Sequence, residues 1–435
     1  MLPAMPPRSK QKPTAAMRAP IELAIVELGA RGDGIADYRG ERVFVPLALP
    51  GERVSARILG RRGDGLAAEL IQITSPAPER QDAACRHFGR CGGCAAQHLA
   101  APAYAGWKRG IVADALARRG LDAGVVEAPI PVPPATRRRA EFTLVGRRSQ
   151  PVAGFAQRAS HAIVDLAECP VALPEIVAML APLRQCFAGW LSAGARVEAM
   201  ANATASGLDL LLTLPDPPDL ALRERLADLA QSLDLARLSW RRAGEPCEPL
   251  AARRPFGIRF ADVWVELPPG AFLQATEAGE AAIRAVVLEG TGKAARIADL
   301  YAGAGTLSLP LAAGARVHAV EGDPDLVAAL TRAARPLGGR LGVEARDLAR
   351  SPLAAPELDR FDAVVFDPPR TGAREQAAEL ALSKVAHVIG VSCHPGSFAR
   401  DARLLVDGGY RLLRVLPIDQ FLWSSQIELV AWFRR

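Results

Sequence analysis

The chain has 435 residues, of which 50% are hydrophobic, and its 53 Lys and Arg against 47 Asp and Glu give a formal net charge of +6. This length suggests roughly three domains, and the hydrophobic content excludes a largely disordered chain. The charge is mild, but its sign favours a phosphate backbone as partner, so the composition is compatible with nucleic acid.

The first 19 residues are rich in Pro and Ala and contain four basic residues and no acid, which predicts a flexible basic arm. This segment has no continuous apolar run of the kind a signal peptide requires. No window of about 18 apolar residues elsewhere is free of glycine breaks or charges. We therefore expect a cytoplasmic protein with no membrane partner.

Residues 20–76 contain short runs in which apolar and polar residues alternate, such as IELAIVEL and LAAELIQIT. Gly-Asp-Gly clusters separate these runs and are typical hairpin signals, so the segment predicts a small β-barrel of short strands. Barrels of this size often bind oligonucleotides. A packing domain with no ligand fits the same pattern.

Residues 77–265 combine a Gly-rich cysteine loop, CRHFGRCGGC, with a helical segment and several strands, which predicts a central α+β domain. The first strand region is crowded with arginines, which form either a solvated face or an RNA-binding surface. These arginines are Arg137, Arg138, Arg139, Arg147, Arg148 and Arg158.

The seven cysteines are odd in number and unevenly spaced, a pattern that indicates a reducing compartment and thiol chemistry or metal binding instead of a disulfide scaffold. Cys85, Cys91 and Cys94 have the spacing C-x5-C-x2-C, and Cys169 lies farther along in the motif ECP. Four thiolates suit either tetrahedral zinc or an iron–sulfur cluster, and spacing alone leaves both open.

From residue 266 to the end, apolar strands alternate with Ala- and Leu-rich helices, which predicts a doubly wound, Rossmann-like α/β domain with a parallel sheet. Such sheets bind ligands at the carboxyl ends of their strands. Gly303, Glu321, Asp367 and Cys393 each follow or close a different predicted strand. The sequence therefore predicts that these four residues meet at one edge of the sheet, which is the candidate site.

The segment DLYAGAGTLSLPLAA places a Gly-x-Gly turn, Gly303 and Gly305, between a strand and a helix, where backbone N–H groups can approach a ligand closely. Glu321 closes the next strand and could accept hydrogen bonds from ribose hydroxyls. A nicotinamide nucleotide would also fit this plan. The segment FDPPRTG favours another ligand, because its prolines hold Asp367 and nearby carbonyls rigidly at a strand end, as suits a planar base.

Together these motifs resemble the uracil-C5 RNA methyltransferases that use S-adenosylmethionine, in particular the 23S ribosomal RNA branch with an N-terminal TRAM barrel and a 4Fe-4S cluster. The resemblance extends from about residue 20 to the end of the chain. The segments that carry it are HFGRCGGCAAQHL, GFAQRASHAIVDLAECP, FLQAT, DLYAGAGTLSLPLA, FDPPRTG and SCHPGSFARD.

The resemblance implies a role for each motif. Cys393 matches the nucleophile that adds to carbon 6 of uracil, and Glu428 in WSSQIELVAWF matches the general base that removes the carbon-5 proton. The expected S-adenosylmethionine site consists of Gln274, Tyr301, Gly303, Gly305, Glu321, Asp347 and Asp367. The expected ligands of the 4Fe-4S cluster are Cys85, Cys91, Cys94 and Cys169.

The chain departs from the family pattern near the predicted base, where Gln426 replaces a histidine and FLWSS replaces a proline-threonine pattern, and also at Thr276 and His394, which replace asparagines. The replacement at Gln426 leaves open how the predicted general base, Glu428, is positioned. His394 and Arg400 are candidate cations for lowering the pKa of Cys393, although His394 also fits an ordinary turn position.

We expect methylation of uridine C5 in 23S rRNA by a monomeric enzyme that has no DNA partner. The same chemistry on tRNA is the nearest alternative, because some relatives with clusters act on tRNA. A noncatalytic RNA-binding or ribosome-assembly factor with the same fold is a further alternative. A radical S-adenosylmethionine enzyme would need a C-x3-C-x2-C triad, and the sequence lacks that spacing.

Overall fold

The computed structural model describes residues 19–435, so the predicted basic arm lies outside the described residues except for Ala19. The described chain divides into two compact units. The first runs to Gly89 and adds Cys94–Trp107 and Trp423–Ser425; the second comprises Arg90–Gly93, Lys108–Leu422 and Gln426–Arg435. Within residues 19–435, no helix is both long and apolar enough to cross a membrane.

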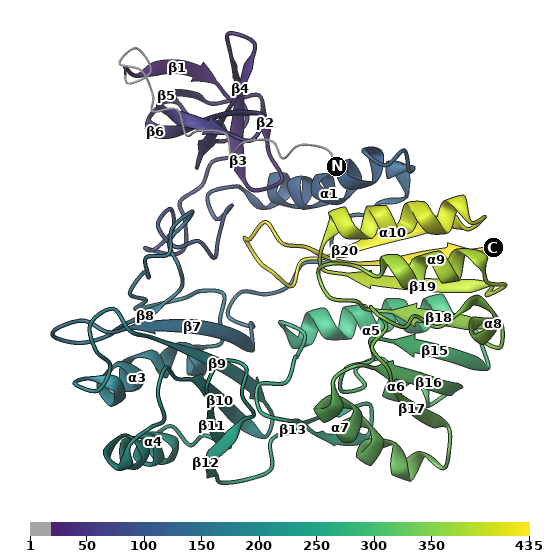
Figure 1. Ribbon diagram of the computed structural model, residues 1–435. Helices are drawn as coiled ribbons and strands as arrows, with labels where there is room; N and C mark the ends of the chain where they lie inside the picture. Colours follow the sequence, from purple (N-terminus) through teal and green to yellow (C-terminus); the bar gives the residue numbers. More distant parts are fainter. Residues whose placement is uncertain (1–18) are drawn as a thin grey trace, which may run out of the picture. The chain divides into compact units, whose positions relative to one another are not determined.

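The first unit is built on a six-stranded sheet in the order β1-β5-β6-β4-β3-β2 (Figure 1). Its strands are β1 (Ile21–Ala24), β2 (Glu27–Leu28), β3 (Asp33–Tyr38), β4 (Glu41–Pro46), β5 (Arg53–Arg62) and β6 (Gly65–Ser75). Neighbouring strands are antiparallel except for the pair β4 and β6. Apolar side chains alternate along β5, with Val54, Ala56 and Ile58 buried, so one face of the sheet forms the core.

The second unit contains a central six-stranded sheet in the order β12-β11-β10-β9-β7-β8. Its strands are β7 (Arg139–Val145), β8 (Val152–Gly154), β9 (Arg196–Thr204), β10 (Gly207–Thr213), β11 (Arg237–Arg241) and β12 (Glu248–Ala252). The helices α2 (Pro174–Ala178), α3 (Leu180–Phe187) and α4 (Leu220–Ser232) contribute buried side chains to the same apolar core as the strands. Helix α1 (Ala101–Ala117) begins in the first unit and ends in the second.

A seven-stranded sheet in the order β17-β16-β15-β18-β19-β21-β20 forms the rest of the second unit (Figure 1). Its strands are β15 (Arg296–Leu300), β16 (Arg316–Glu321), β17 (Leu341–Ala345), β18 (Ala363–Phe366), β19 (His387–Ser392), β20 (Arg411–Ile418) and β21 (Glu428–Arg434). The helices that alternate with them are α5 (Glu277–Thr291), α6 (Ser308–Leu311), α7 (Pro324–Ala334), α8 (Ala355–Leu358), α9 (Arg374–Leu382) and α10 (Pro395–Asp407). The predicted α/β arrangement of this part of the chain is confirmed.

The remaining short elements are the hairpin β13 (Gly257–Phe260) and β14 (Val263–Glu266) and two 3₁₀ turns, η2 (Ala123–Val125) and η3 (Arg335–Leu337). The sequence-based domain limits, 20–76, 77–265 and 266–435, stay a prediction.

One strand departs from the predicted parallel sheet. Strand β21 lies between β19 and β20 and is antiparallel to both. The reason is local: only the loop 419–427 separates β20 from β21, which is too short for a parallel crossover. As a consequence, the first residue of β21, Glu428, lies at the edge where the parallel strands end.

Arg138 also differs from the sequence interpretation that grouped it with RNA-facing arginines. It is buried, and its Nε donates to the carbonyl of Gln274 at 3.1 Å, while its guanidinium pairs with Glu280 on α5 at 2.5 Å. Its own N–H donates to the Ala275 carbonyl at 2.9 Å. Arg138 therefore fixes the segment that carries Gln274, because a buried guanidinium requires hydrogen-bonded partners.

Candidate active site

The carboxyl ends of the parallel strands bring the predicted site residues to one edge of the seven-stranded sheet. Tyr301 follows β15, Glu321 ends β16, Asp367 follows β18 and Cys393 follows β19. Because β21 is antiparallel, Glu428 joins them at the same edge. Adjacent strands in register hold these positions in fixed order, so the backbone itself defines the site.

The predicted cofactor loop has the backbone conformation that its glycines favour. Gly303 and Gly305 have φ values of 56° and 95°, a region in which glycine is the ordinary residue. A Cβ at Gly305 would lie 2.5 Å from Leu330 Cδ1, so a side chain would not fit there. The N–H of Gly303 donates to Glu321 Oε2 at 2.8 Å, which ties the loop to the end of β16.

Glu321 has further backbone partners. Its Oε1 accepts the N–H groups of Gly322 and Asp323, each at 2.8 Å. A carboxylate offers about four acceptor positions, so Glu321 retains capacity for a ligand's hydroxyl groups. Asp347, the expected adenine contact, follows β17 and caps a turn by accepting the Ala349 N–H at 3.0 Å.

Asp299 is a site residue that sequence reasoning missed. It is the fourth residue of β15, it is buried, and the Ser308 hydroxyl donates to its Oδ2 at 2.5 Å. Burial raises its pKa to about 7, and the negative charges of Asp367 and Glu321 add to this shift. An aspartate inside an otherwise apolar strand, directly before the glycine loop, was the available signal.

A continuous chain of hydrogen bonds connects Asp367 to Glu428. Gln274 Nε2 donates to Asp367 Oδ2 at 3.2 Å, and Gln274 Oε1 accepts from Gln420 Nε2 at 2.7 Å. Gln420 Nε2 also donates to Glu428 Oε2 at 2.8 Å, while its Oε1 accepts the Ala275 N–H at 3.0 Å. Gln420, which lies in the loop before β21, was not identified from the sequence, and no local motif marks it.

The two carboxyl groups of this chain are difficult to ionise. Burial raises the pKa of Asp367 to about 7. Burial also raises the pKa of Glu428 well above the usual carboxyl range, and the charge of Asp367 raises it further. Glu428 Oε1 is buried and has no hydrogen-bond partner among residues 19–435. This oxygen can therefore accept a proton, and a carboxylate in this environment is a stronger base than an exposed one.

Cys393 is half-buried in the same environment. Burial raises the pKa of its thiol to about 11, and the charges of Glu428 and Asp367 act in the same direction. Arg370 is the cation that opposes this shift. The thiol is therefore protonated in the ligand-free protein at neutral pH, and its addition to a substrate requires loss of the proton.

The expectation that His394 and Arg400 lower the pKa of Cys393 does not fit the structure. His394 caps α10, where its Nδ1 accepts the Ser397 N–H at 3.1 Å, and burial lowers its pKa, so it is neutral at pH 7. Arg400 pairs with Asp401 at 2.7 Å. The cation beside the thiol is Arg370 instead.

Thr276 and Gln426, which also depart from the family pattern, both make defined hydrogen bonds. Thr276 caps α5, and its hydroxyl accepts the Gly279 N–H at 3.0 Å, as an asparagine could. Gln426 Oε1 accepts a hydrogen bond from Arg370 Nη2 at 2.6 Å. Gln426 therefore orients the guanidinium that acts on Cys393.

The four predicted metal-binding cysteines are distributed over the two units. Cys85 and Cys94 belong to the first unit, whereas Cys91 and Cys169 belong to the second, where both border the apolar core of the central sheet. Across the described residues 19–435, no group of three or more His, Cys, Asp or Glu side chains is placed to hold a metal ion. The iron–sulfur cluster stays a prediction.

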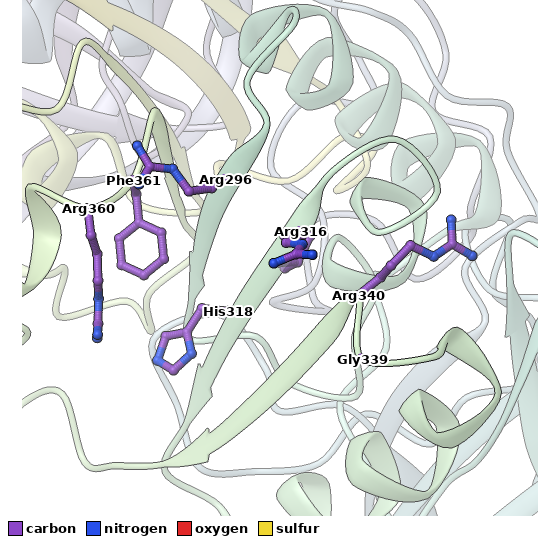
Figure 2. Close-up of a pocket in the computed structure, with 8 residues that line it drawn as sticks. Arg296, Arg316, His318, Gly339, Arg340, Arg360 and Phe361 are labelled. Atoms are coloured by element: carbon purple, nitrogen blue, oxygen red, sulfur yellow. The ribbon is translucent and has the colours of Figure 1, made fainter.

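A shallow hollow of about 240 Å³ lies at the opposite edge of the seven-stranded sheet. Figure 2 shows its lining residues, among them Arg296 and Arg316, which begin β15 and β16, and His318 beside Phe361. None of the predicted site residues lines it. The hollow is therefore separate from the candidate active site.

Comparisons with known proteins agree with this geometry, although no family model matches the chain. An uncharacterized RNA methyltransferase of Brucella suis is 44% identical over 94% of this chain and 97% of its own. The 23S rRNA (uracil(1939)-C(5))-methyltransferase RlmD of Halomonas elongata is 35% identical over 94% of this chain and 88% of its own. Among solved structures, Pyrococcus abyssi tRNA (uracil-54, C5)-methyltransferase with S-adenosyl-L-homocysteine has a TM-score of 0.73 and 21% identity, covering 97% and 100% of the two chains.

The fold matches that of a solved methyltransferase, and relatives at 35% to 44% identity carry RNA methyltransferase names, so the class is that of RNA methyltransferases. The chain belongs to the uracil-C5 RNA methyltransferase family.

Proposed function

We propose that the protein methylates carbon 5 of a uridine in 23S rRNA through a covalent adduct between Cys393 and carbon 6 of the base. The observation that carries this proposal is the placement of a thiol, a hydrogen-bonded carboxyl pair and a glycine loop at one sheet edge. Carbon 5 of uracil is a poor nucleophile. Addition of a thiolate to carbon 6 produces an enolate whose carbon 5 can attack a sulfonium methyl group.

In this mechanism the half-buried Cys393 thiol gives its proton to solvent water, Arg370 favours the resulting thiolate, and the thiolate attacks carbon 6. Carbon 5 then takes the methyl group. Glu428 removes the carbon-5 proton through its free Oε1, and the carbon–sulfur bond breaks to restore the carbon 5–carbon 6 double bond and the Cys393 thiolate. The raised pKa of Glu428 supports this role, because a buried carboxylate binds a proton more strongly than an exposed one.

S-adenosylmethionine supplies the methyl group on its sulfonium. We assign its binding to the loop of Tyr301, Gly303 and Gly305, with Glu321 on the ribose hydroxyls and Asp347 near the adenine. Gln274 and Asp367 would border the methionine part and the uracil, a role supported by the hydrogen bond between them at 3.2 Å. The fit is chemical: the carboxylates of Glu321, Asp347 and Asp367 suit the hydroxyl and ammonium groups of this cofactor.

The assignment to 23S rRNA rests on sequence. The cysteine loop and the N-terminal strands resemble the 23S branch, and the Halomonas elongata relative carries a 23S rRNA name. The Pyrococcus abyssi structure, which has a tRNA name, supports tRNA as a second candidate. In either case the base must leave its stack to reach Cys393.

We also propose that Cys85, Cys91, Cys94 and Cys169 hold a 4Fe-4S cluster that fixes the cysteine loop. The proposed reaction uses none of these four thiols, and four cysteine thiolates are the usual ligands of such a cluster. Purified protein should then contain about four iron atoms per chain and absorb visible light. A Cys91→Ser protein that lacks iron but keeps the stability and RNA affinity of the wild type would contradict the structural role.

The test of the activity uses labelled S-adenosylmethionine with undermodified 23S rRNA and, separately, undermodified tRNA. We expect label at uridine C5 in 23S rRNA with the wild type and none with Cys393→Ala. Label in tRNA alone would show that the substrate is tRNA and would leave the proposed reaction unchanged. Folded wild type that binds RNA and labels neither would overturn the proposed function.

A further inference from the structure

Lys108 is a fully buried lysine that the mechanism above does not use. It lies on α1, and its side chain has no exposed area. Its Nζ pairs with Asp419 Oδ1 at 2.7 Å and donates to the backbone carbonyls of Phe421 at 3.3 Å and Gln426 at 2.5 Å. The buried ammonium is thus compensated by an ion pair and by two backbone hydrogen bonds.

All three partners belong to one loop, 419–427, which connects β20 to β21. Asp419 and Phe421 lie on its first arm, and Gln426 lies on its second, so Lys108 joins the two arms. Burial of a charge is unfavourable unless it is paired and hydrogen-bonded. A lysine that is completely removed from water in this way fixes the geometry of the loop it contacts.

The same loop carries the contacts that orient the reacting groups. Gln420, adjacent to Asp419, donates to Glu428 at 2.8 Å. Gln426, whose carbonyl Lys108 holds, accepts from Arg370 at 2.6 Å. Glu428 itself begins the strand that follows the loop. The glycine loop, by contrast, is tied to Glu321 at the end of β16 through the Gly303 N–H.

We infer that Lys108 is a positioning residue for proton removal: by joining the two arms of the loop 419–427, it places Gln420 and Glu428 for the step that releases methylated RNA. This inference rests on the proposed function. Loss of Lys108 is therefore expected to slow resolution of the methylated adduct more than its formation.

The test compares wild type with Lys108→Met, using the RNA that wild type methylates. Methyl label is measured in released RNA and in the protein–RNA complex that survives denaturing electrophoresis. We expect release to slow about tenfold or more, the label in the complex to rise, and the KM for S-adenosylmethionine to stay unchanged. Lys293→Met is the matched control, because Lys293 is exposed, and it should behave as wild type.

A second variant separates positioning from folding. Lys108→Met leaves Asp419 as a buried charge without its lysine, so the combination with Asp419→Asn removes both charges and should recover melting temperature. The combined variant should still accumulate the labelled complex.

Folded Lys108 variants that release RNA at the wild-type rate would overturn the inference. The same holds if both variants fail to fold, because Lys108 would then act in folding alone. Wild type that methylates no RNA would instead remove the proposed function, and the inference with it.

Discussion

Gln420 is the residue on which the candidate active site depends most and which the sequence marks least. Its amide donates to both Gln274 and Glu428 and accepts from the Ala275 backbone. The Gln420 side chain thus connects the predicted general base, Glu428, to the segment of Gln274 and Ala275. The family motifs identified its partners, but a glutamine in a loop has no pattern that reveals a contact 146 residues away in sequence.

Replacing Gln420 by leucine should impair both activity and stability. The leucine keeps the volume but leaves the Ala275 N–H and Glu428 Oε2 without their partner, at a cost of about 1 to 3 kcal/mol. Misplacement of the base should lower the methylation rate roughly 10- to 100-fold. Gln185→Leu, at an exposed position of α3, is the matched control in both assays. A fully active Gln420→Leu protein would show that this network does not orient Glu428.

The buried carboxyls also predict how stability depends on pH. Burial raises the pKa of Asp299 from its ordinary 3.8 to about 7, so between these values the folded protein binds more protons than the unfolded chain. This contribution to stability is complete below pH 3.8 and is lost as the pH rises through about 7. Asp367, whose pKa is also about 7, adds the same trend.

Asp299→Asn should therefore flatten the fall of melting temperature between pH 4 and 7, because the amide cannot ionise. The exposed Asp262→Asn, followed by the same thermal scans, should leave the wild-type curve unchanged. An Asp299→Asn curve parallel to that of wild type would show that this carboxyl does not gain a proton on folding.

At the scale of elements, the strand ends were predictable and the strand order was not. Asp367 and Cys393 follow apolar runs, and parallel strands must end together, so their meeting could be expected. The antiparallel insertion of β21 depends on long-range pairing that no local pattern encodes. Glu428 was matched to a base by resemblance alone, and the topology supplies the physical reason why it lies beside Cys393.

The connection between α5 and the segment directly before β7 is a further element-scale feature. Arg138 and Glu280 are both buried, and loss of one partner leaves the other as an unpaired buried charge. Arg138→Met should lower stability by about 3 to 5 kcal/mol, measured by denaturant unfolding. Arg138→Met with Glu280→Gln should be more stable than Arg138→Met alone.

Arg148→Met, at an exposed position, serves as control for that pair and should unfold as wild type does. If Arg138→Met also matched wild type, the ion pair would not hold the segment of Gln274. If the combined variant were no better than Arg138→Met, the loss would come from packing and not from the unpaired carboxyl.

At the scale of the whole molecule, the alternation of strands and helices predicted the α/β fold, the motif resemblance predicted a methyltransferase, and the relatives place the chain in its family. The arginine cluster was less informative: Arg138 is buried in an ion pair, while Arg147 and Arg148 are exposed. Neighbouring positions in the sequence do not reveal which arginine is buried, because burial depends on the sheet or helix against which each side chain packs. The four cysteines were grouped by spacing and resemblance, and their joint role requires a metal measurement.

The central claim is a covalent intermediate between Cys393 and carbon 6 of uridine. The most direct measurement uses substrate RNA that contains 5-fluorouridine, whose fluorine Glu428 cannot remove as it would a proton. With labelled S-adenosylmethionine, wild type should form a denaturation-resistant complex that contains protein, RNA and methyl label, and Cys393→Ala should form none. Wild type that methylates ordinary uridine but forms no such complex, or a Cys393→Ala complex equal to that of wild type, would contradict the account.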